Sequence, residues 1–373
     1  MTRKLALIVT AAGAAISPAA AQQFWTVGAG YLSSSISNNG AVVGDNNGTG
    51  QYFLWTADNG PTDIGGQVAG NGVGGTAGIS YDGSYVGGTM FNTASGFHEM
   101  GRYSVSTGSW TALGGLGASS DGEISSGWGI SGDGNSVVGL GWIPGGGAHA
   151  TRWTDGQGMN DLGSTVAGRS SRANAANLDA SVVVGWQDGA GRQGAVWVNG
   201  VQQLIFDNGG AVVNEAYTVS GNGEWVSGID VAGFVGTASL WRYNTVTQSY
   251  EDLGNLATGG QSRAGGNAIN ADGTLIAGGT WGIGPATFGT AIIWQDGVGV
   301  TRFSDYLDNL GVAYDAGFQF AFVSDMSEDG TWFTGWGRDS TNQLTSFVIN
   351  VPAPSALPVL AMGGLFAARR RRG

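Results

Sequence analysis

The sequence predicts an all-β protein: a seven-bladed β-propeller built from four-stranded antiparallel blades. Three observations lead to this prediction. Glycine is abundant, with 71 among 373 residues, and it recurs at turn positions rather than in low-complexity runs. One phrase, an apolar residue and Ser or Asn before a turn and a β-branched run, returns seven times. Its spacing is about 48 residues, within the range of four-stranded propeller blades.

The repeated phrase predicts the first two strands of each blade. Its clearest copies run from Ile36 to Gly44 and from Ile130 to Gly139, whereas the copy from Ala176 to Gly185 lacks the turn glycine. Asp-Gly and Asn-Gly pairs between apolar runs are hairpin signals, because their turns need positive φ. The closing glycines of the seven copies are Gly44, Gly87, Gly139, Gly185, Gly228, Gly278 and Gly335.

Two further phrases predict the third and fourth strands. A small residue precedes an aromatic, and a phrase such as Asp161-Leu162-Gly163 often follows. Tryptophans that recur in phase with the repeat are expected to pack between blades. They are Trp55, Trp153, Trp197, Trp241 and Trp294.

The first residues of the mature chain are expected to close the ring. The last repeat has no fourth phrase, and Phe24–Gly28 forms a strand with no repeat of its own. That strand fits the missing place, and closure would remove the open sheet edges on which β proteins aggregate. An open β-solenoid and two smaller propellers are the alternatives.

One short helix is expected between the sixth and seventh repeats, over Ser304–Gly311. Ser304 is placed to cap its start, Leu307 and Leu310 share a face, and Gly311 is placed to end it.

The N-terminal segment, residues 1–21, predicts a secretory signal. Arg3 and Lys4 precede an apolar run from Leu5 to Ile16, and Ala19-Ala20-Ala21 provides small residues for cleavage by signal peptidase. A buried N-terminal helix is the structural alternative. Residues 22–350 then form the propeller, and the terminal signal helices lie outside the fold.

The C-terminal segment, residues 351–373, predicts a sorting tag. An apolar run of 13 residues, Ala356–Ala368, is shorter than the roughly 20 residues that a stable membrane span needs. The arginines after it favour keeping that end on the cytoplasmic side. A simple tail anchor is the alternative. The motif and basic residues are Val351, Pro352, Ala353, Pro354, Ser355, Arg369, Arg370, Arg371 and Arg372.

This tail resembles the PEP-CTERM sorting signal of Gram-negative bacteria, with Ala353 where the family usually has glutamate. The resemblance implies an exosortase-type processing enzyme as partner, transient anchoring by the C-terminal segment, and placement at the cell surface or in the extracellular matrix. The repeats resemble those of HAF-repeat extracellular proteins, most closely in His149-Ala150, Trp153 and Asp161-Leu162-Gly163. That resemblance implies a repeat fold outside the cell and carries no catalytic residues.

Charge and composition restrict the partners. Six of the 15 basic residues lie in the two terminal segments, so residues 22–350 hold 9 basic and 27 acidic residues, a net charge of −18. Such an acidic surface argues against nucleic acid and anionic membrane as partners. The chain has no Cys, so it has neither disulfides nor thiol chemistry.

No catalytic constellation is evident in the sequence. His98 and His149 fall on third strands, where a structural role is expected, and paired-His metal spacing is absent. The Asp-Gly turns could bind Ca²⁺, although Asp also stabilises turns through its own backbone, which is the preferred interpretation. Those turns contain Asp82, Asp133, Asp272 and Asp329.

The leading hypothesis is a non-enzymatic surface propeller without a cofactor that binds extracellular polysaccharide or surface proteins. Tryptophans out of phase with the repeat are its candidate binding residues, because packing does not require them. A carbohydrate-active lyase or hydrolase with paired carboxylates on one propeller face is the alternative. The candidate binding tryptophans of the leading hypothesis are Trp128, Trp142, Trp281 and Trp336.

Overall fold

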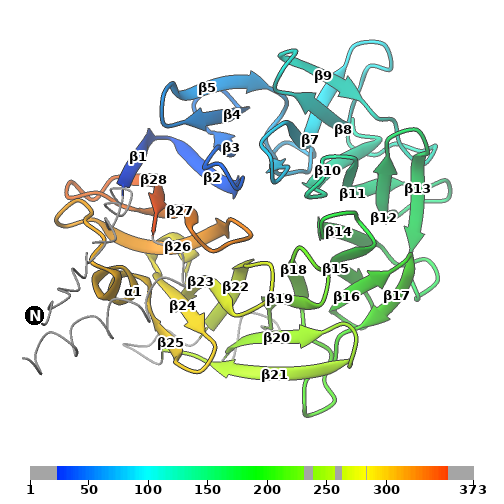
Figure 1. Ribbon diagram of the computed structural model, residues 1–373. Coiled ribbons are helices and arrows are strands. Elements are labelled where there is room, and N and C mark those ends of the chain that lie inside the picture. The colour runs from blue at the N-terminus through cyan, green and yellow to red at the C-terminus, as the bar shows by residue number, and fades with distance from the viewer. Residues whose placement is uncertain (1–22, 231–237, 257–262, 283, 352–373) are drawn as a thin grey trace, which may run out of the picture.

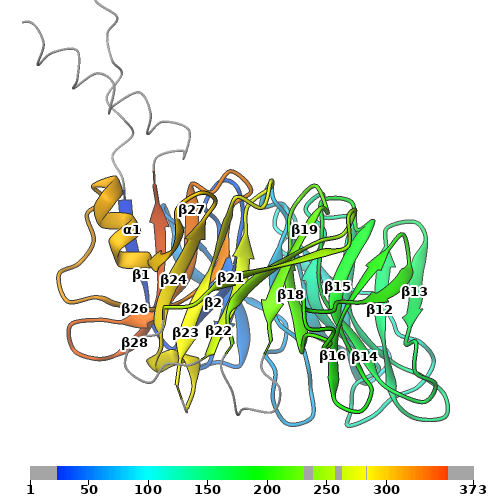
Figure 2. The ribbon, with the colours of Figure 1, turned by 90° about the horizontal axis from the view of Figure 1, so that it is seen from below.

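The protein is an all-β ring of antiparallel sheets (Figure 1). The computed structural model describes residues 23–230, 238–256, 263–282 and 284–351, and these form 28 strands, the helix α1 and the short 3-10 helix η2 (Ala286–Phe288). The sheets radiate around a central axis, and seen from the side the ring is a flat disc (Figure 2). Among the described residues, no helix is long and apolar enough to cross a membrane.

Four sheets on one side of the ring each hold four strands in chain order. The first contains β2 (Tyr31–Ile36), β3 (Val42–Asn46), β4 (Gln51–Thr56) and β5 (Gly60–Gly65). The second contains β6 (Gly78–Ile79), β7 (Tyr85–Asn92), β8 (Phe97–Ser104) and β9 (Ser109–Ala112). The third contains β10 (Ser125–Ile130), β11 (Ser136–Trp142), β12 (Ala148–Thr154) and β13 (Gly158–Gly163). The fourth contains β14 (Ser171–Ala176), β15 (Val182–Asp188), β16 (Arg192–Val198) and β17 (Val201–Leu204).

An eight-stranded sheet follows, in which two four-stranded groups are joined, within the part of the chain that the structure describes, by the single strand pair Ile229 and Gly265. Its first group contains β18 (Glu215–Val219), β19 (Trp225–Ile229), β20 (Leu240–Asn244) and β21 (Ser249–Gly254). Its second group contains β22 (Arg263–Ile269), β23 (Leu275–Trp281), β24 (Thr290–Gln295) and β25 (Gly299–Arg302).

The remaining sheet joins the two ends of the chain. It has the order β1-β28-β27-β26, with β1 (Gln23–Ala29), β26 (Gln319–Met326), β27 (Trp332–Arg338) and β28 (Leu344–Asn350). Gln23 pairs with Asn350 and Ala29 with Thr345. The sheet is tied to β2, since the Ser33 N–H donates to Ser346 Oγ at 2.7 Å and the Trp336 indole N–H donates to the Ser33 carbonyl at 3.1 Å.

The inner strand of each four-stranded group is the one nearest the ring axis: β2, β6, β10, β14, β18, β22 or β26. The turn after each inner strand is built by its own side chains, as the repeated phrase predicts. In the third sheet the Ser131 hydroxyl donates to Asp133 Oδ1 at 2.6 Å, and that oxygen also accepts the Asn135 N–H. Gly134 then has φ of 73°, a left-handed conformation that favours glycine. In the copy without glycine, Ala180 takes φ of 55° instead. The Asp residues thus serve as turn formers.

The closing glycines have a steric reason. A Cβ on Gly185 would lie 1.9 Å from the Arg172 carbonyl oxygen of the neighbouring inner strand. Five more closing glycines face an inner-strand carbonyl oxygen in the same way, at 1.9–2.1 Å from the Cβ position. At Gly87 the nearest atom would be 3.1 Å away, where β6 pairs only through Gly78 and Ile79. The five closing glycines that face a carbonyl oxygen as Gly185 does are Gly44, Gly139, Gly228, Gly278 and Gly335.

The core is divided into seven clusters of buried apolar residues among the described residues, and each cluster lies between neighbouring four-stranded groups. The in-phase tryptophans Trp55, Trp197, Trp241 and Trp294 are buried in these clusters, and Trp153 packs against one of them. The prediction that in-phase tryptophans pack between blades is therefore confirmed.

Arginines on third strands add ties between neighbouring groups. The Arg242 guanidinium lies between the rings of Trp225 and Trp294, at 4.2 and 4.5 Å from their centroids. Its Nη1 donates to the Gly273 carbonyl at 3.0 Å, and its Nε donates to Glu251 at 2.7 Å. A cation between two aromatic faces with a carbonyl acceptor is a stabilising contact.

The predicted helix forms as α1 (Phe303–Leu310), beside the sheet that joins the chain ends (Figure 1). Gly311 ends it in the left-handed conformation, with φ of 70°. The prediction that Ser304 caps its start is wrong. Arg302 occupies the N-cap position without a side-chain cap, and Ser304 already lies inside the first turn. Burial of Phe303 and Leu307 in the core fixes the start of the helix instead.

Candidate functional site

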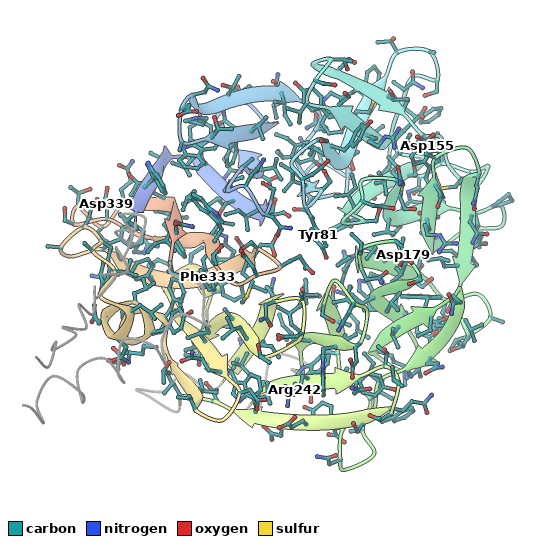
Figure 3. The ribbon with its side chains drawn as sticks, in the orientation of Figure 1. Tyr81, Asp155, Asp179, Arg242, Phe333 and Asp339 are labelled. Atoms are coloured by element: carbon teal, nitrogen blue, oxygen red, sulfur yellow. The ribbon has the colours of Figure 1, made fainter. Side chains whose placement is uncertain are left out.

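A cavity of about 390 Å³ lies on the ring axis, where the inner strands face one another. The inner strand of every four-stranded group contributes to its lining: β2, β6, β10, β14, β18, β22 and β26. In Figure 3 the Tyr81 side chain points into this central region. The volume lies in the lower part of the range of small-ligand sites, roughly 300–1,000 Å³.

A β-bulge at the same place in six inner strands determines which side chains line the cavity. In β10 the register moves from Gly127 to Gly129, so Trp128 has no partner on β11. A bulge re-aims its extra residue, and every one of these extra residues lines the cavity. They are Ser34, Trp128, Asn174, Tyr217, Asn267 and Ser324.

Asp45 carries one of the two buried side-chain oxygens among the described lining residues that lack a hydrogen bond. It follows the closing glycine Gly44 on β3, opposite Leu32 of the inner strand. Its Oδ1 is buried and has no hydrogen-bond partner, as is also true of Asn267 Oδ1. Burial raises the pKa of the Asp45 carboxyl to about 6. Two unpaired acceptors on one cavity are a costly arrangement unless a ligand supplies donors.

Asp325 lines the same cavity, but its carboxylate is fully engaged. Its Oδ2 accepts the Ser35 hydroxyl at 2.8 Å and the Ile36 N–H at 2.9 Å, and its Oδ1 accepts the Met326 N–H at 2.9 Å. Burial raises its pKa to about 6, against the lowering effect of these bonds. Asp325 therefore joins β26 to β2.

Glu328 lies at the end of the cavity where the inner strands turn. Its carboxylate accepts hydrogen bonds from the Tyr81 hydroxyl and the Gly221 N–H. Burial, reinforced by the nearby Asp325 charge, raises the pKa of Glu328 to about 7. The pKa of Tyr81 also rises, because it is buried beside Glu328.

The structure separates the four candidate tryptophans into two pairs. Trp128 and Trp336 line the cavity, whereas Trp142 and Trp281 are not among its lining residues. Trp128 carries the Arg172 guanidinium at 3.6 Å from its ring centroid. Trp336 stacks on Phe322 with 4.9 Å between centroids. At the far ends of their strands, Trp142 donates its indole N–H to Glu123 at 3.3 Å and Trp281 packs beside Phe322.

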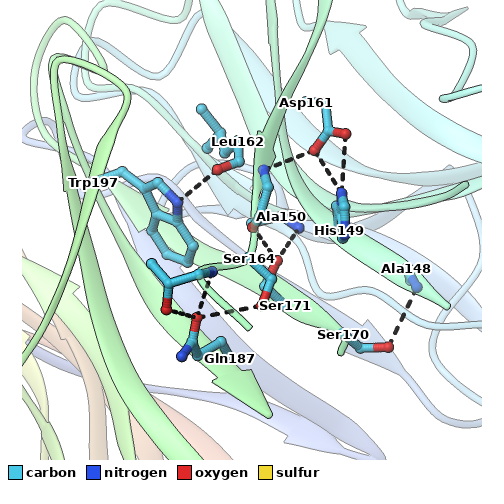
Figure 4. Close-up of polar contacts among 12 residues, drawn as sticks. Ala148, His149, Ala150, Asp161, Leu162, Ser164, Ser170, Ser171, Gln187 and Trp197 are labelled. Atoms are coloured by element: carbon cyan, nitrogen blue, oxygen red, sulfur yellow. Dashed lines mark hydrogen bonds and ion pairs between the residues drawn. The ribbon is translucent and has the colours of Figure 1, made fainter. Parts of the chain in front are cut away.

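The histidines take part in strand contacts. His149 Nδ1 lies 2.9 Å from both Asp161 carboxylate oxygens (Figure 4). The Ser171 hydroxyl accepts a hydrogen bond from the Ala150 N–H at 2.9 Å and donates one to the Gly163 carbonyl. The His-Ala and Asp-Leu-Gly phrases thus lock the third strand to the fourth and to the next sheet. His98 packs edge-on against Phe91, with 5.1 Å between centroids.

The sorting motif is described only at its first residue. Val351 is buried in the core, and its N–H donates to the Thr331 carbonyl at 2.8 Å. The remaining predicted tag residues, Pro352–Ser355 and Arg369–Arg372, lie outside the described residues, as does the signal segment 1–21. In the part of the chain that is described, no group of three or more His, Asp or Glu is placed to hold a metal ion.

Sequence reasoning missed Asp45, Asn267, Tyr81 and Glu328. Three position-specific signals were available. Asp45 and Trp336 occupy the same repeat position, directly after a closing glycine, and Asn267 and Trp128 occupy the same bulge position. Tyr81 and Glu328 are the large members of a turn position that holds Gly132 and Gly221 in other repeats.

Comparison with known proteins supports the fold class. No family model matches the chain, and neither does any curated protein. Among solved structures it is similar to an oligogalacturonate lyase in complex with manganese, at 12% identity over 89% of this chain and 93% of that chain, with a TM-score of 0.53. It is also similar to the β-propeller domain of the trilobed protease from Pyrococcus furiosus, at 12% identity over 87% and 98%, with a TM-score of 0.53.

A third similar structure is TolB from Acinetobacter baumannii, at 14% identity over 70% of this chain, with a TM-score of 0.46; the chain spans 62% of that protein. With a ring of antiparallel four-stranded groups, and with the lyase and the trilobed-protease domain as structural neighbours, the chain is a β-propeller. At such low identity the likeness shows the fold alone.

Proposed function

We propose that the ring is a seven-bladed propeller closed by the N-terminal strand. Seven inner strands line the cavity, and seven core clusters alternate with seven four-stranded groups. The eight-stranded sheet counts as two blades, because among the described residues Ile229 and Gly265 are the only strand pair that joins its two groups. β1 supplies the outer strand of the blade formed by β26, β27 and β28.

We further propose that this propeller is a non-enzymatic binding protein whose ligand is extracellular polysaccharide, held in the central cavity. The observation that carries the proposal is the lining itself: Trp128 and Trp336 offer aromatic surface, while Asp45 and Asn267 offer unpaired acceptors. A sugar ring brings apolar C–H faces for the first pair and hydroxyl donors for the second. Surface proteins are the second ligand class of the proposal.

The proposed location is the surface or extracellular matrix of a Gram-negative bacterium. The signal segment would be removed by signal peptidase, and the tail handled by an exosortase-type enzyme. Because Gln23 pairs with Asn350, the two segments join the propeller at neighbouring points. The net charge of −18 for residues 22–350 disfavours nucleic acid and anionic membrane as ligands of the propeller.

A carbohydrate-active lyase or hydrolase is the second candidate. It is favoured by the three carboxyl groups in the cavity, whose pKa values are all raised. Glycoside hydrolysis by the usual route needs two available carboxyl groups. Asp325 is held by three donors and Glu328 by two, so only Asp45 is unengaged. This difference favours binding over catalysis.

A glycan array with the exported protein, purified after removal of its signal segment, tests the proposal. Trp128→Phe and Trp336→Phe should weaken binding of the recognised glycan. Trp142→Phe and Trp281→Phe are matched controls outside the cavity and should leave it unchanged. Absence of binding to every glycan would overturn the polysaccharide proposal, and release of new reducing ends would favour the enzyme.

A further inference from the structure

One end of the cavity is ringed by the turns that follow the inner strands. The second residue of each turn forms this turn ring: Asn38, Tyr81, Gly132, Leu178, Gly221, Ala271 and Glu328. Neighbouring turns are linked by hydrogen bonds. The Asn38 N–H donates to the Tyr81 carbonyl at 2.8 Å, and the Tyr81 N–H to the Gly132 carbonyl at 2.9 Å. Further around, the Ala271 N–H donates to the Glu328 carbonyl at 2.8 Å.

Two long side chains extend across the space inside the turn ring. The Tyr81 ring lies over Gly132, where a Cβ would come within 2.2 Å of it. The Glu328 carboxylate lies against Gly221, where a Cβ would meet Oε2. Through its bonds to the Tyr81 hydroxyl and the Gly221 N–H, Glu328 connects three turns that are not neighbours in the ring. Glycine at two positions makes room for large side chains at two others, and both of these side chains line this end of the cavity.

The charge of the lining restricts the ligand. Asp45, Asp325 and Glu328 are the charged residues that line the cavity, and its described lining holds no Arg, Lys or His. A ligand with carboxylate or sulfate groups would meet acids without a compensating cation. A hydroxyl or ammonium group would instead pair with the Asp45 carboxylate, which lines the cavity.

We propose that the cavity is a blind site that binds the end of a saccharide chain, or a free short saccharide, whose sugars carry no acid group. The inference rests on the proposed glycan-binding function and deepens it. A polymer cannot pass through a cavity that Tyr81 and Glu328 close, so its interior units are excluded. The ligand enters from the opposite end, near Asp45 and Trp336.

The first experiment compares ligands with and without ends. Isothermal titration measures binding of a linear neutral oligosaccharide chosen from the array, of its cyclised counterpart, and of a free mono- or disaccharide of the same sugar. The linear and the free short forms should bind, and the cyclised form at least about tenfold more weakly. Oligogalacturonate serves as the acidic probe and should not bind. Equal binding of the cyclised form, or tight binding of the acidic probe, would overturn the inference.

The second experiment uses variants of the blocking residue and of the free acceptor. In the wild type, affinity should stop rising once added sugar units no longer fit. Glu328→Ala removes one of the two blocking side chains and its bond to Tyr81, so longer oligosaccharides should gain affinity. Glu328→Gln keeps a side chain of the same length there and should leave the length dependence unchanged. Asp45→Asn should weaken binding about tenfold, the value of one hydrogen bond of about 1.4 kcal/mol.

The outcomes separate the two proposals. If the wild type binds no glycan, the proposed function fails and the inference with it. If the wild type binds glycans but the length dependence is the same in Glu328→Ala, only the blind-site inference fails. Circular dichroism of each variant verifies that the propeller remains folded.

Discussion

Replacing Asp45 with asparagine should make the propeller more stable at neutral and alkaline pH, because the change removes a buried charge that lacks a partner. Asp45 Oδ1 has no hydrogen bond, and burial places the pKa of this carboxyl at about 6 against the ordinary 3.8. A raised pKa means that the folded state holds the proton more tightly than the unfolded state. The contribution of protonated Asp45 to the free energy of unfolding is therefore complete below pH 3.8 and is lost as the pH rises through about 6.

The size of the effect follows from the two pKa values. They differ by about 2.2 pH units, and one unit corresponds to about 1.4 kcal/mol, so ionised Asp45 costs the folded state about 3 kcal/mol at pH 8. Asparagine has no such cost and keeps nearly the same shape. The gain in free energy of unfolding should therefore be below about 1 kcal/mol at pH 4 and about 3 kcal/mol at pH 8.

Urea denaturation of the wild type and the variant at both pH values measures this difference. Asp58→Asn makes the same charge change on the exposed turn of the same sheet and should shift stability by less than about 0.5 kcal/mol. A gain that is equal at the two pH values, or a variant less stable than the wild type at pH 8, would refute the reasoning. Stability of the wild type should itself fall from pH 4 to pH 8, since the pKa values of Asp325 and Glu328 are also raised.

Three further changes test the fold. Gly185→Ala places a methyl group against a backbone carbonyl and should cost about 3 kcal/mol or more, whereas Gly191→Ala, with open space around it, should change stability by less than about 0.5 kcal/mol in urea titrations. Arg242→Ala removes a cation held between two tryptophans and should lower the free energy of unfolding by about 2 kcal/mol, while loss of the exposed partner in Glu251→Gln should cost below about 0.5 kcal/mol. Deletion of residues 23–29 exposes the edge of β28 and should cause aggregation, which light scattering detects. A peptide with the sequence of residues 23–29 should reverse this aggregation. A monomeric, fully stable deletion variant would contradict ring closure by β1.

The repeat made much of the fold predictable. A turn phrase that returns with the same closing glycine identifies paired strands, because the Cβ that glycine lacks would strike the inner strand at six of the seven positions. In-phase tryptophans could be assigned to packing for the same reason: a repeat places equivalent residues in equivalent environments. Helix α1 was found from its apolar face and Gly311, but its start was misplaced, since burial of Phe303 outweighed the capping preference of Ser304.

The candidate site was predictable only where it departs from the repeat. Trp128 stood out as a large residue that packing did not require, and it lines the cavity. The repeat positions of Asp45 and Glu328 could be read from the sequence, but their properties could not, because a single carboxyl acquires its character from residues on other blades. The free Oδ1 of Asp45 and the bond of Glu328 to Tyr81 depend on how distant parts of the chain face one another across the axis. A linear pattern does not contain that information.

The pairing of β1 with β28 has a consequence for the order of folding. The Gly28 N–H donates to Thr345 Oγ1, a residue 317 positions later in the chain. At roughly 5–20 residues per second, synthesis of that interval takes roughly 16–60 s, during which the first strand has no partner. Such a long sequence separation makes this sheet a late step in assembly. Two chains that fold side by side can therefore exchange their first strands, so crowded refolding favours a domain-swapped dimer, whereas dilution favours the monomer.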